Sequence, residues 1–174
     1  MARLHDLKHV DLDNCYWGMA TSLWFNGCQH RCIGCWNAET WDIDDNLYID
    51  NDSIVEETLF ALDEFGLKKD LSLLGGDPLA PSNIEDTIYI LSKIKEQRPE
   101  TRVLCWTGYR WEQLVNNKFF NRVLPFIDIL IDGKYEKELH IEGHKFGSSN
   151  QKVVDVKQSL LYNSKVEANE NYEE

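Results

Sequence analysis

The sequence predicts an α/β fold, specifically a partial, open version of a (β/α) barrel with a mostly parallel sheet. Three observations support this. Short apolar runs alternate with segments of helical periodicity, which is the pattern of βα units. Glycine-rich turns follow several of the apolar runs. The chain has only 174 residues, whereas a complete barrel of eight units takes about 250 residues.

Five segments are predicted to be strands, because each is short, apolar and rich in β-prone residues. In chain order they cover residues 19–26, 70–74, 102–107, 126–131 and 152–156. The first strand runs into a cysteine-rich loop, and glycine-containing turns follow the next two. In open α/β sheets ligands bind at the carboxyl ends of the strands, so we expect these turns to line one site.

Three helices are expected between these strands. The first covers 53–65, where Ser53 and Glu56 form a capping box and Gly66 ends the helix. The other two cover 83–97 and 111–116. In the longer of them apolar residues recur at helical spacing, which predicts an amphipathic helix packed on the sheet.

Composition limits the remaining possibilities. One domain is predicted over residues 1–163, followed by an acidic tail, 164–174, which lacks apolar periodicity and is expected to be disordered. The net charge of −12 argues against a nucleic-acid partner. No apolar run is long enough to span a bilayer, and residues 1–10 do not resemble a secretory signal. We therefore expect a cytoplasmic protein that binds neither membranes nor nucleic acids.

Three cysteines carry the clearest chemical signal. They are Cys28, Cys32 and Cys35, spaced C-x3-C-x2-C. Three thiolates in one short loop can hold one face of a cuboidal [4Fe–4S] cluster, which leaves the fourth iron open for a small molecule. Zinc is the competing interpretation, but structural zinc sites usually show two separated ligand pairs, and His30 is poorly placed inside the loop. Cys15 and Cys105 are expected to be bystanders, although Cys15 remains open as a fourth ligand.

Several short motifs occur in a fixed order along residues 23–156. They are Asn26-Gly27-Cys28, Gly34-Cys35-Trp36-Asn37, Glu39-Thr40-Trp41, Leu74-Gly75-Gly76-Asp77-Pro78-Leu79, Trp106-Thr107-Gly108-Tyr109, Asp128-Ile129-Leu130-Ile131-Asp132-Gly133-Lys134 and Gly147-Ser148-Ser149-Asn150-Gln151. Each motif alone is weak, but the ordered set is specific. It resembles the anaerobic ribonucleoside-triphosphate reductase-activating proteins, a family of the radical S-adenosylmethionine (SAM) superfamily.

The resemblance implies both fold and chemistry. The barrel would be of the abridged radical SAM type, and the three cysteines would hold a [4Fe–4S] cluster whose open iron binds the amino and carboxylate groups of SAM. Reductive cleavage of SAM would give a 5′-deoxyadenosyl radical, which abstracts a hydrogen atom from a glycine of the reductase. No catalytic side chain is expected beyond the cluster and SAM, because such chemistry belongs to the cofactors.

The resemblance also implies partners. These are the anaerobic ribonucleoside-triphosphate reductase, a flavodoxin- or ferredoxin-type electron donor and a second copy of the chain in a homodimer. Two other functions stay open: another small radical SAM enzyme, such as a pyruvate formate-lyase-type activase or a deazapurine synthase-like enzyme, and a non-catalytic zinc or iron–sulfur module.

Five residues are predicted to contact SAM. Gly75 and Gly76 would let its methionine part approach the backbone, because glycine has no Cβ. Asp77 would accept a hydrogen bond from its ammonium group. Gly34 and Trp36 would contact its adenine, since aromatic faces suit purine stacking. A plain turn, for the glycines and Asp77, and simple packing of the loop, for Trp36, are the alternatives.

Two positions depart from the family pattern. Residues 13–20 stand where the family commonly shows a Gly-Pro-Gly stretch with a nearby arginine, and Phe146 stands where an arginine often precedes the last motif. Neither change affects the three clustered cysteines. We expect such changes to bear on partner docking or on the binding of SAM's carboxylate.

Overall fold

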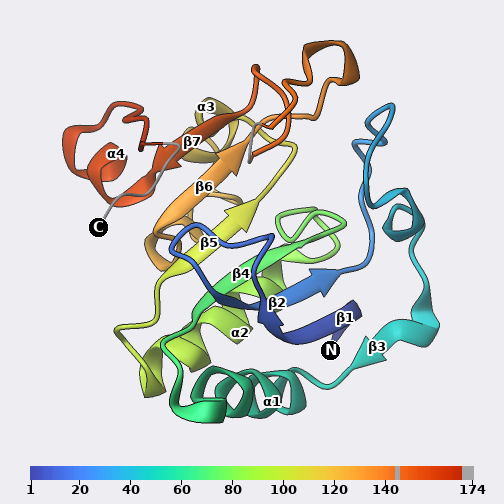
Figure 1. Ribbon diagram of the computed structural model, residues 1–174, viewed down its shortest axis with the longest axis vertical. Coiled ribbons are helices and arrows are strands. Elements are labelled where there is room, and N and C mark those ends of the chain that lie inside the picture. The colour runs from blue at the N-terminus through green and yellow to red at the C-terminus, as the bar shows by residue number, and fades with distance from the viewer. Residues whose placement is uncertain (144–145, 170–174) are drawn as a thin grey trace.

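The computed structural model describes residues 1–143 and 146–169. Within them one open sheet has the strand order β3-β1-β2-β4-β5-β6-β7 (Figure 1). The strands are β1 (Ala2–Asp11), β2 (Ala20–Phe25), β3 (Tyr48–Ile49), β4 (Asp70–Gly75), β5 (Val103–Trp106), β6 (Ile129–Asp132) and β7 (Lys152–Asp155). The four central strands, β2, β4, β5 and β6, are parallel, whereas β1, β3 and β7 pair antiparallel. The predicted α/β class is confirmed, and the sheet is parallel in its middle, as expected, but antiparallel at both edges.

Helices connect the parallel strands. They are α1 (Asn51–Asp63), α2 (Ile84–Gln97) and α3 (Trp111–Val115), with α4 (Val156–Tyr162) after β7. Short 3-10 helices cover Ala38–Thr40 (η1), Asp45–Leu47 (η2), Glu64–Gly66 (η3), Leu124–Phe126 (η4) and Lys137–Leu139 (η5). The helices α1 and α2 pack side by side (Figure 1). No helix in the described part of the chain is long and apolar enough to cross a membrane.

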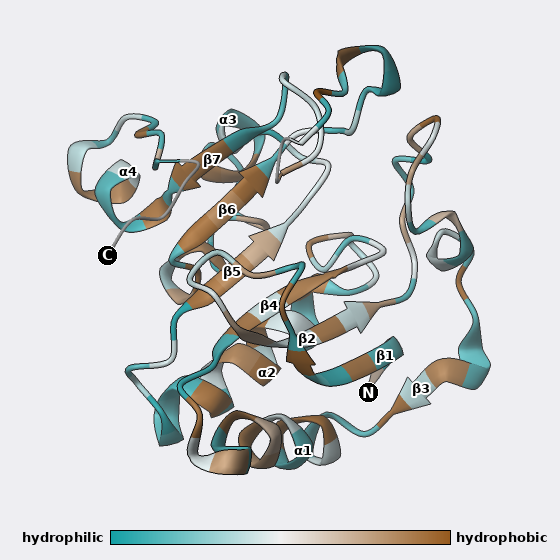
Figure 2. Cartoon of the chain, in the orientation of Figure 1, coloured by the Kyte–Doolittle hydropathy of each residue, from teal (hydrophilic) through white to brown (hydrophobic). Residues whose placement is uncertain are grey.

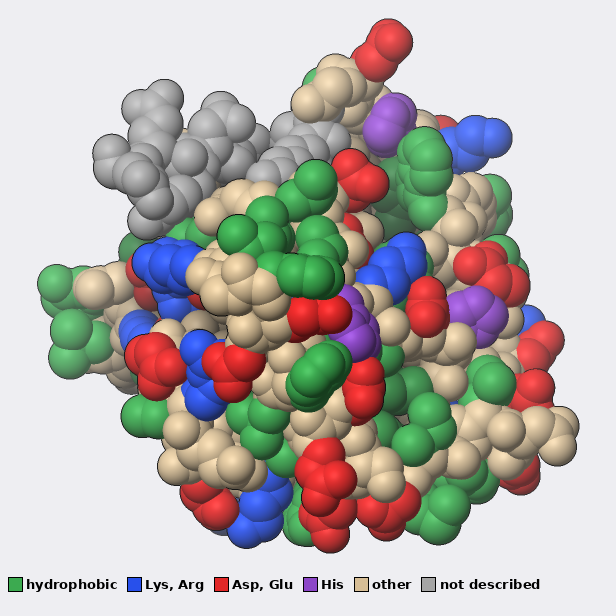
Figure 3. Space-filling view, turned by 60° about the horizontal axis from the view of Figure 1, so that its bottom comes forward, with side chains coloured by type: hydrophobic (Ala, Val, Ile, Leu, Met, Phe, Trp, Pro, Cys, Tyr) green, Lys and Arg blue, Asp and Glu red, His purple; other side chains and the backbone are tan. Residues whose placement is uncertain are grey.

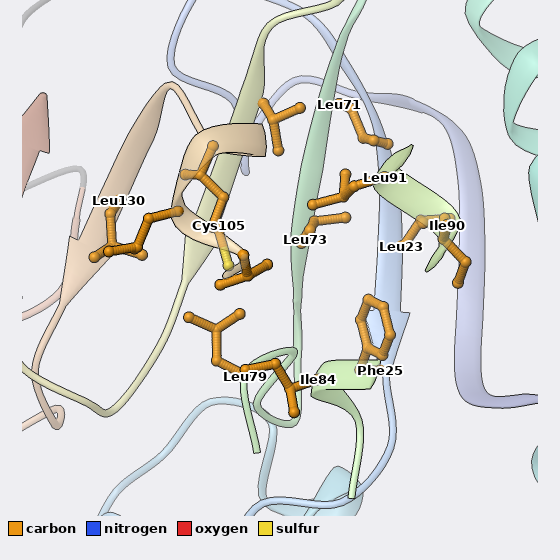
Figure 4. Packing of buried hydrophobic residues seen from close by; sticks show 14 of the residues in the cluster. Leu23, Phe25, Leu71, Leu73, Leu79, Ile84, Ile90, Leu91, Cys105 and Leu130 are labelled. Atoms are coloured by element: carbon orange, nitrogen blue, oxygen red, sulfur yellow. The ribbon is translucent and has the colours of Figure 1, made fainter. Parts of the chain in front are cut away.

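The main core lies between one face of the sheet and the helices α1, α2 and α3. The inner parallel strands are covered on both faces, so they read as nearly continuous apolar runs. Figure 2 shows β4 and β6 as mainly hydrophobic. Figure 4 shows Leu23, Phe25 and Leu73 of the sheet facing Ile84, Ile90 and Leu91 of α2. The thiol of Cys105 belongs to this core.

A smaller apolar cluster covers the opposite face of the sheet. Its buried members are Tyr16, Leu104, Ile129, Ile131, Phe146 and Val153. Phe146 is 1% exposed, and its ring lies 6.0 Å from that of Tyr16 and 5.7 Å from that of Trp106. The two departures from the family pattern therefore pack against each other, one residue from each.

The α1 helix begins earlier than expected and uses a different cap. Asp50 is the N-cap, and its carboxylate accepts hydrogen bonds from the backbone N–H groups of Asp52 and Ser53. The predicted capping box of Ser53 and Glu56 is therefore wrong. An aspartate three residues upstream can reach two unpaired N–H groups at once, which leaves Ser53 within the first turn.

Other boundaries also differ. The strand predicted over 126–131 starts at Ile129, because Leu124–Phe126, which contains Pro125, forms a 3-10 turn instead. The strands β1 and β3 and the helix α4 were not expected from the sequence. In β1 only Ala2, Leu4 and Asp11 are buried, and the residues between them include several charged side chains. The strand therefore carries only a weak apolar signal.

The tail predicted to be disordered is ordered over 164–169. Ala168 N donates to Val153 O at 2.8 Å, and Asp155 N donates to Val166 O at 2.9 Å, so this segment lies along β7. Long-range backbone pairing gives the segment a structure that its acidic composition does not suggest. Residues 170–174 lie outside the described residues.

Acidic side chains are spread over the face of the molecule shown in Figure 3.

A histidine bridge joins β1 to the region around α1. His9 Nδ1 lies 2.8 Å from Glu64 Oε2, and its Nε2 lies 2.7 Å from Glu57 Oε1. The hydrogen bond to Glu64 raises the pKa of His9, burial opposes this, and Glu57 raises it further. The protonated ring therefore stabilises the contact between β1 and these two glutamates.

We predict that His9→Gln destabilises the protein more at acidic than at alkaline pH. Because the folded-state pKa of His9 is raised, its stabilising effect is complete below the unfolded pKa and disappears as pH rises through the folded pKa. Chemical denaturation of both proteins at about pH 5.5 and about pH 8.5, on either side of the ordinary histidine pKa of about 6.5, measures the difference. The control is His5→Gln, an exposed histidine of β1. A destabilisation that does not change with pH would contradict the prediction.

Candidate active site

A cavity of about 530 Å³ lies at the carboxyl ends of the parallel strands. The turns after β2, β4, β5 and β6 all contribute to its lining, as the order of glycine-rich turns predicts. Seven of the eight predicted site residues line it: Cys28, Cys32, Cys35, Trp36, Gly75, Gly76 and Asp77. Gly34 is not among the lining residues. A Cβ on Gly34 would lie 3.0 Å from Lys137 Cδ, so this glycine makes room for the lysine stem.

Backbone N–H groups from several segments are directed at the three thiols. Asn37 N donates to Cys35 Sγ at 3.4 Å, and the backbone of Tyr135 donates to Cys32. Cys28 receives N–H groups from His30 and Arg31. Hydrogen bonds to the sulfurs are among the features by which a protein sets the reduction potential of an iron–sulfur cluster.

The thiols are partly buried, and this affects their acidity. Burial and, after it, the nearby charge of Asp77 raise the pKa of Cys28 to about 11. Burial likewise raises the pKa of Cys32, which also faces Cys35. The three cysteines are therefore close enough for the charge of one thiolate to raise the pKa of the next.

The donor set fits a cluster better than a single metal ion. Among the described residues, no three Cys, His, Asp or Glu side chains converge as one ion would require. A cuboidal cluster instead binds each cysteine at a different iron, so its ligands need to share a cavity and not a point. His30 does not form such a three-ligand group with the cysteines among the described residues, and its Nε2 bonds to Asp77.

Asp77 is 1% exposed and holds several segments together. Leu79 N donates to its Oδ1 at 2.8 Å. Its Oδ2 accepts from His30 Nε2 at 2.8 Å, from Thr107 Oγ1 at 3.0 Å and from Gly108 N at 3.1 Å. The carboxylate that the sequence assigns to SAM's ammonium group thus already accepts four hydrogen bonds from the protein.

Gly75 and Gly76 lie against protein backbone. A Cβ on Gly75, whose φ is +95°, would come within 2.7 Å of Phe25 O. A Cβ on Gly76 would come within 2.7 Å of Gly27 O, and Gly76 N donates to Phe25 O at 2.8 Å. The two glycines therefore allow the turn after β4 to pass directly over the end of β2. The sequence predicted that the backbone here lies close to a ligand. The structure shows that it also lies close to the backbone of β2 and of the cysteine loop.

Trp36 is 79% exposed at the rim of the cavity, so it does not simply pack the cysteine loop. Two other tryptophans that line the cavity, Trp41 and Trp106, have buried indole N–H groups with no hydrogen-bond partner among the described residues. These two donors are positioned inside the wall of the cavity.

The Gly147–Gln151 motif braces the turn after β6, a role that the sequence did not reveal. Gln151 Nε2 donates to Gly133 O at 3.0 Å, and Asn150 Nδ2 donates to Lys134 O at 2.8 Å. Since Lys134 and Tyr135 line the cavity and the Tyr135 N–H reaches Cys32, the motif supports the cysteine site from outside. The signal that could have found this brace is its run of short polar side chains directly before a strand.

Comparison with known proteins agrees with the chemistry of this cavity. Residues 17–154 match the family described as 4Fe-4S single cluster domain. Curated relatives named anaerobic ribonucleoside-triphosphate reductase-activating protein include one from Enterobacteria phage T4, 36% identical over 137 residues, which are 78% of this chain and 83% of the relative. The Haemophilus influenzae protein is 34% identical over 70% of this chain and 77% of its own. The Escherichia coli K12 protein is 32% identical over 86% and 96%.

We predict that Gly76→Ala lowers the free energy of unfolding by ~1–3 kcal/mol, because the new methyl group overlaps Gly27 O and pushes the turn after β4 off the cysteine loop. Chemical denaturation measures the loss. Gly66→Ala is the control, since its added Cβ meets nothing within 4 Å and reports only the strain of a positive φ. Stability of the Gly76 variant equal to that of the unaltered protein would contradict the close packing described here.

Proposed function

The chain belongs to the 4Fe-4S single cluster domain family and to the anaerobic ribonucleoside-triphosphate reductase-activating proteins, and we propose from this membership that it is a radical SAM activase. It uses a [4Fe–4S] cluster and SAM to generate a glycyl radical on an anaerobic ribonucleoside-triphosphate reductase. The observation that carries the proposal is the presence of three cysteines in one cavity at the carboxyl ends of parallel strands.

The proposed residue roles follow from the contacts of the cavity. Cys28, Cys32 and Cys35 hold the cluster, and the backbone N–H groups directed at their sulfurs orient them. The bound cluster and SAM supply the reductive cleavage of SAM from which the radical derives. Protein side chains bind, orient and shield these groups.

The size of the cavity supports SAM as its ligand. A volume of about 530 Å³ falls within the usual range for sites that bind small molecules. Gly75 and Gly76 border the methionine part in this proposal, and the exposed indole of Trp36 covers the adenine. Asp77, whose carboxylate is largely occupied, contacts the ammonium group through its remaining Oδ1 lone pair. Gly34 shapes the loop from behind.

The order of elements supports an abridged (β/α) barrel of the radical SAM type. Three consecutive crossovers, through α1, α2 and α3, join the four parallel strands. The sheet stays open, so a protein segment can approach the cavity from the side. Ile33 and Trp36 on the cysteine loop are 82% and 79% exposed, which supports docking of the reductase at this rim.

The remaining partners belong to the same proposal. A flavodoxin- or ferredoxin-type protein delivers the electron, and two copies of the chain form a homodimer. All five cysteines are free thiols, which suits the reducing cytoplasm that we propose as the location.

The test is anaerobic reconstitution with iron and sulfide, followed by addition of reductant and SAM, with and without a co-encoded anaerobic reductase. We expect 5′-deoxyadenosine, and a glycyl radical detected by electron paramagnetic resonance (EPR) only when the reductase is present. Cys32→Ser should lose the cluster's absorption and SAM cleavage together, since two protein ligands remain. Cys105→Ala, a core cysteine outside the cavity, is the control that keeps both.

Other outcomes separate the alternatives. Cleavage of SAM without a radical on the reductase would indicate a different substrate, as for a pyruvate formate-lyase-type or deazapurine synthase-like enzyme. Tightly bound zinc without cleavage would indicate a non-catalytic module and overturn the proposal.

A further inference from the structure

We propose that His30 is a positioning residue that fastens the cysteine loop to the ends of β4 and β5. In this proposal Asp77 serves the site mainly by holding the imidazole ring of His30. The inference rests on the proposed function, because it assigns the cysteine loop to a cluster. His30 stands midway between Cys28 and Cys32, so its anchorage fixes the part of the loop that carries two of the three ligands.

The His30 side chain is 7% exposed and contacts both neighbouring strand ends. Its Nε2 donates to Asp77 Oδ2 at 2.8 Å, which joins it to the turn after β4. Its ring meets that of Tyr109 edge-on, with centroids 4.6 Å apart, which joins it to the turn after β5. The adjacent Gln29 also donates to the Tyr109 hydroxyl. Two consecutive loop residues thus attach to Tyr109.

Gly108 provides the space for this ring. A Cβ there would lie 2.2 Å from His30 Cδ2, which no pair of unbonded carbon atoms tolerates. The φ of Gly108 lies outside the left-handed region, so backbone conformation does not require a glycine at this position. The reason for glycine is the imidazole itself.

Asp77 is held rigid to receive the ring. Leu79 N, Thr107 Oγ1 and Gly108 N fix both carboxylate oxygens from two different turns. A buried carboxylate with this many donors is a fixed acceptor and costs little reorganisation when His30 donates to it. The placement of His30 is therefore determined by segments far from it in the sequence.

The loop needs such an anchor because its backbone is strained. Arg31, directly after His30, has a φ of +48°, in the left-handed region that a non-glycine residue adopts only at a cost in free energy. The backbone N–H groups of His30 and Arg31 favour the thiolate of Cys28. Holding the His30 ring keeps these two donors directed at the sulfur.

The experiment is a double-mutant cycle of His30→Ala and Gly108→Ala in the cluster-loaded protein. Each single substitution should speed the loss of iron to a chelator by about tenfold. This is the lower end of the usual effect of mutating a residue that supports a metal ligand. The double variant should lose iron no faster than His30→Ala alone, because the added methyl no longer meets a ring. The EPR spectrum of the reduced cluster should change in both single variants.

A second cycle tests Asp77. Asp77→Asn and His30→Ala should also be non-additive in iron loss, because they break the same hydrogen bond. His5→Ala, an exposed histidine on β1, is the control with unchanged iron loss and an unchanged spectrum. Circular dichroism melting of each variant separates loss of the fold from release of the loop, since loop release should precede melting.

Additive effects in the first cycle, or single variants that keep iron and spectrum like the unaltered protein, would overturn the inference. A variant that loses iron only where its fold melts would also overturn it. These measurements need neither SAM nor the reductase. A cluster-loaded protein that forms no glycyl radical would therefore count against the proposed function alone, and a protein that takes up no cluster would overturn both.

Discussion

The parallel pairing of β2 with β4 is the interaction on which the rest of the site depends. It runs in continuous register from Ala20 opposite Asp70 to Phe25 opposite Gly75. Both strands are buried on both faces, and their register brings the cysteine loop beside the glycine turn. A shift of β4 by one residue would turn Leu73 away from the main core, which Leu23 would still face, so burial of apolar side chains fixes the position of the site.

Close passage of backbone over backbone makes this arrangement possible. Gly75 and Gly76 let the turn after β4 lie against the end of β2, and Gly76 N and Asp77 N both donate to carbonyl groups there. The turn then presents Asp77 toward the turn after β5. The turns after β4 and β5 and the cysteine loop after β2 are thereby joined through one buried carboxylate, whose burial four donated hydrogen bonds offset.

The opposite side of the sheet shows how two unusual positions fit together. Tyr16 and Phe146 come from segments 130 residues apart, yet their rings pack at a tilt in one apolar cluster with Trp106. Each ring buries apolar surface against the other and against neighbouring residues such as Trp17 and Trp106. The packing therefore joins residues 13–20 to the segment before the last motif.

The sequence by itself determined the elements whose signal is local. The spacing of Cys28, Cys32 and Cys35 indicated the chemistry. The short, mainly apolar segment of β4 and the periodicity of α2 indicated parallel strands with covering helices. Such signals depend on neighbours within one turn or one strand, so they can be read without knowing the fold.

Only the tertiary structure decided what depends on distant partners. The sequence assigned Asp77 to a ligand and gave no sign that Thr107 and Gly108, from the next strand end, also donate to it. Gly108 gave no sign that it makes room for His30, and residues 164–169 gave no sign that they lie along β7. The charged strand β1 was missed for the same reason: its stability comes from pairing with β2 and β3, and not from its own composition.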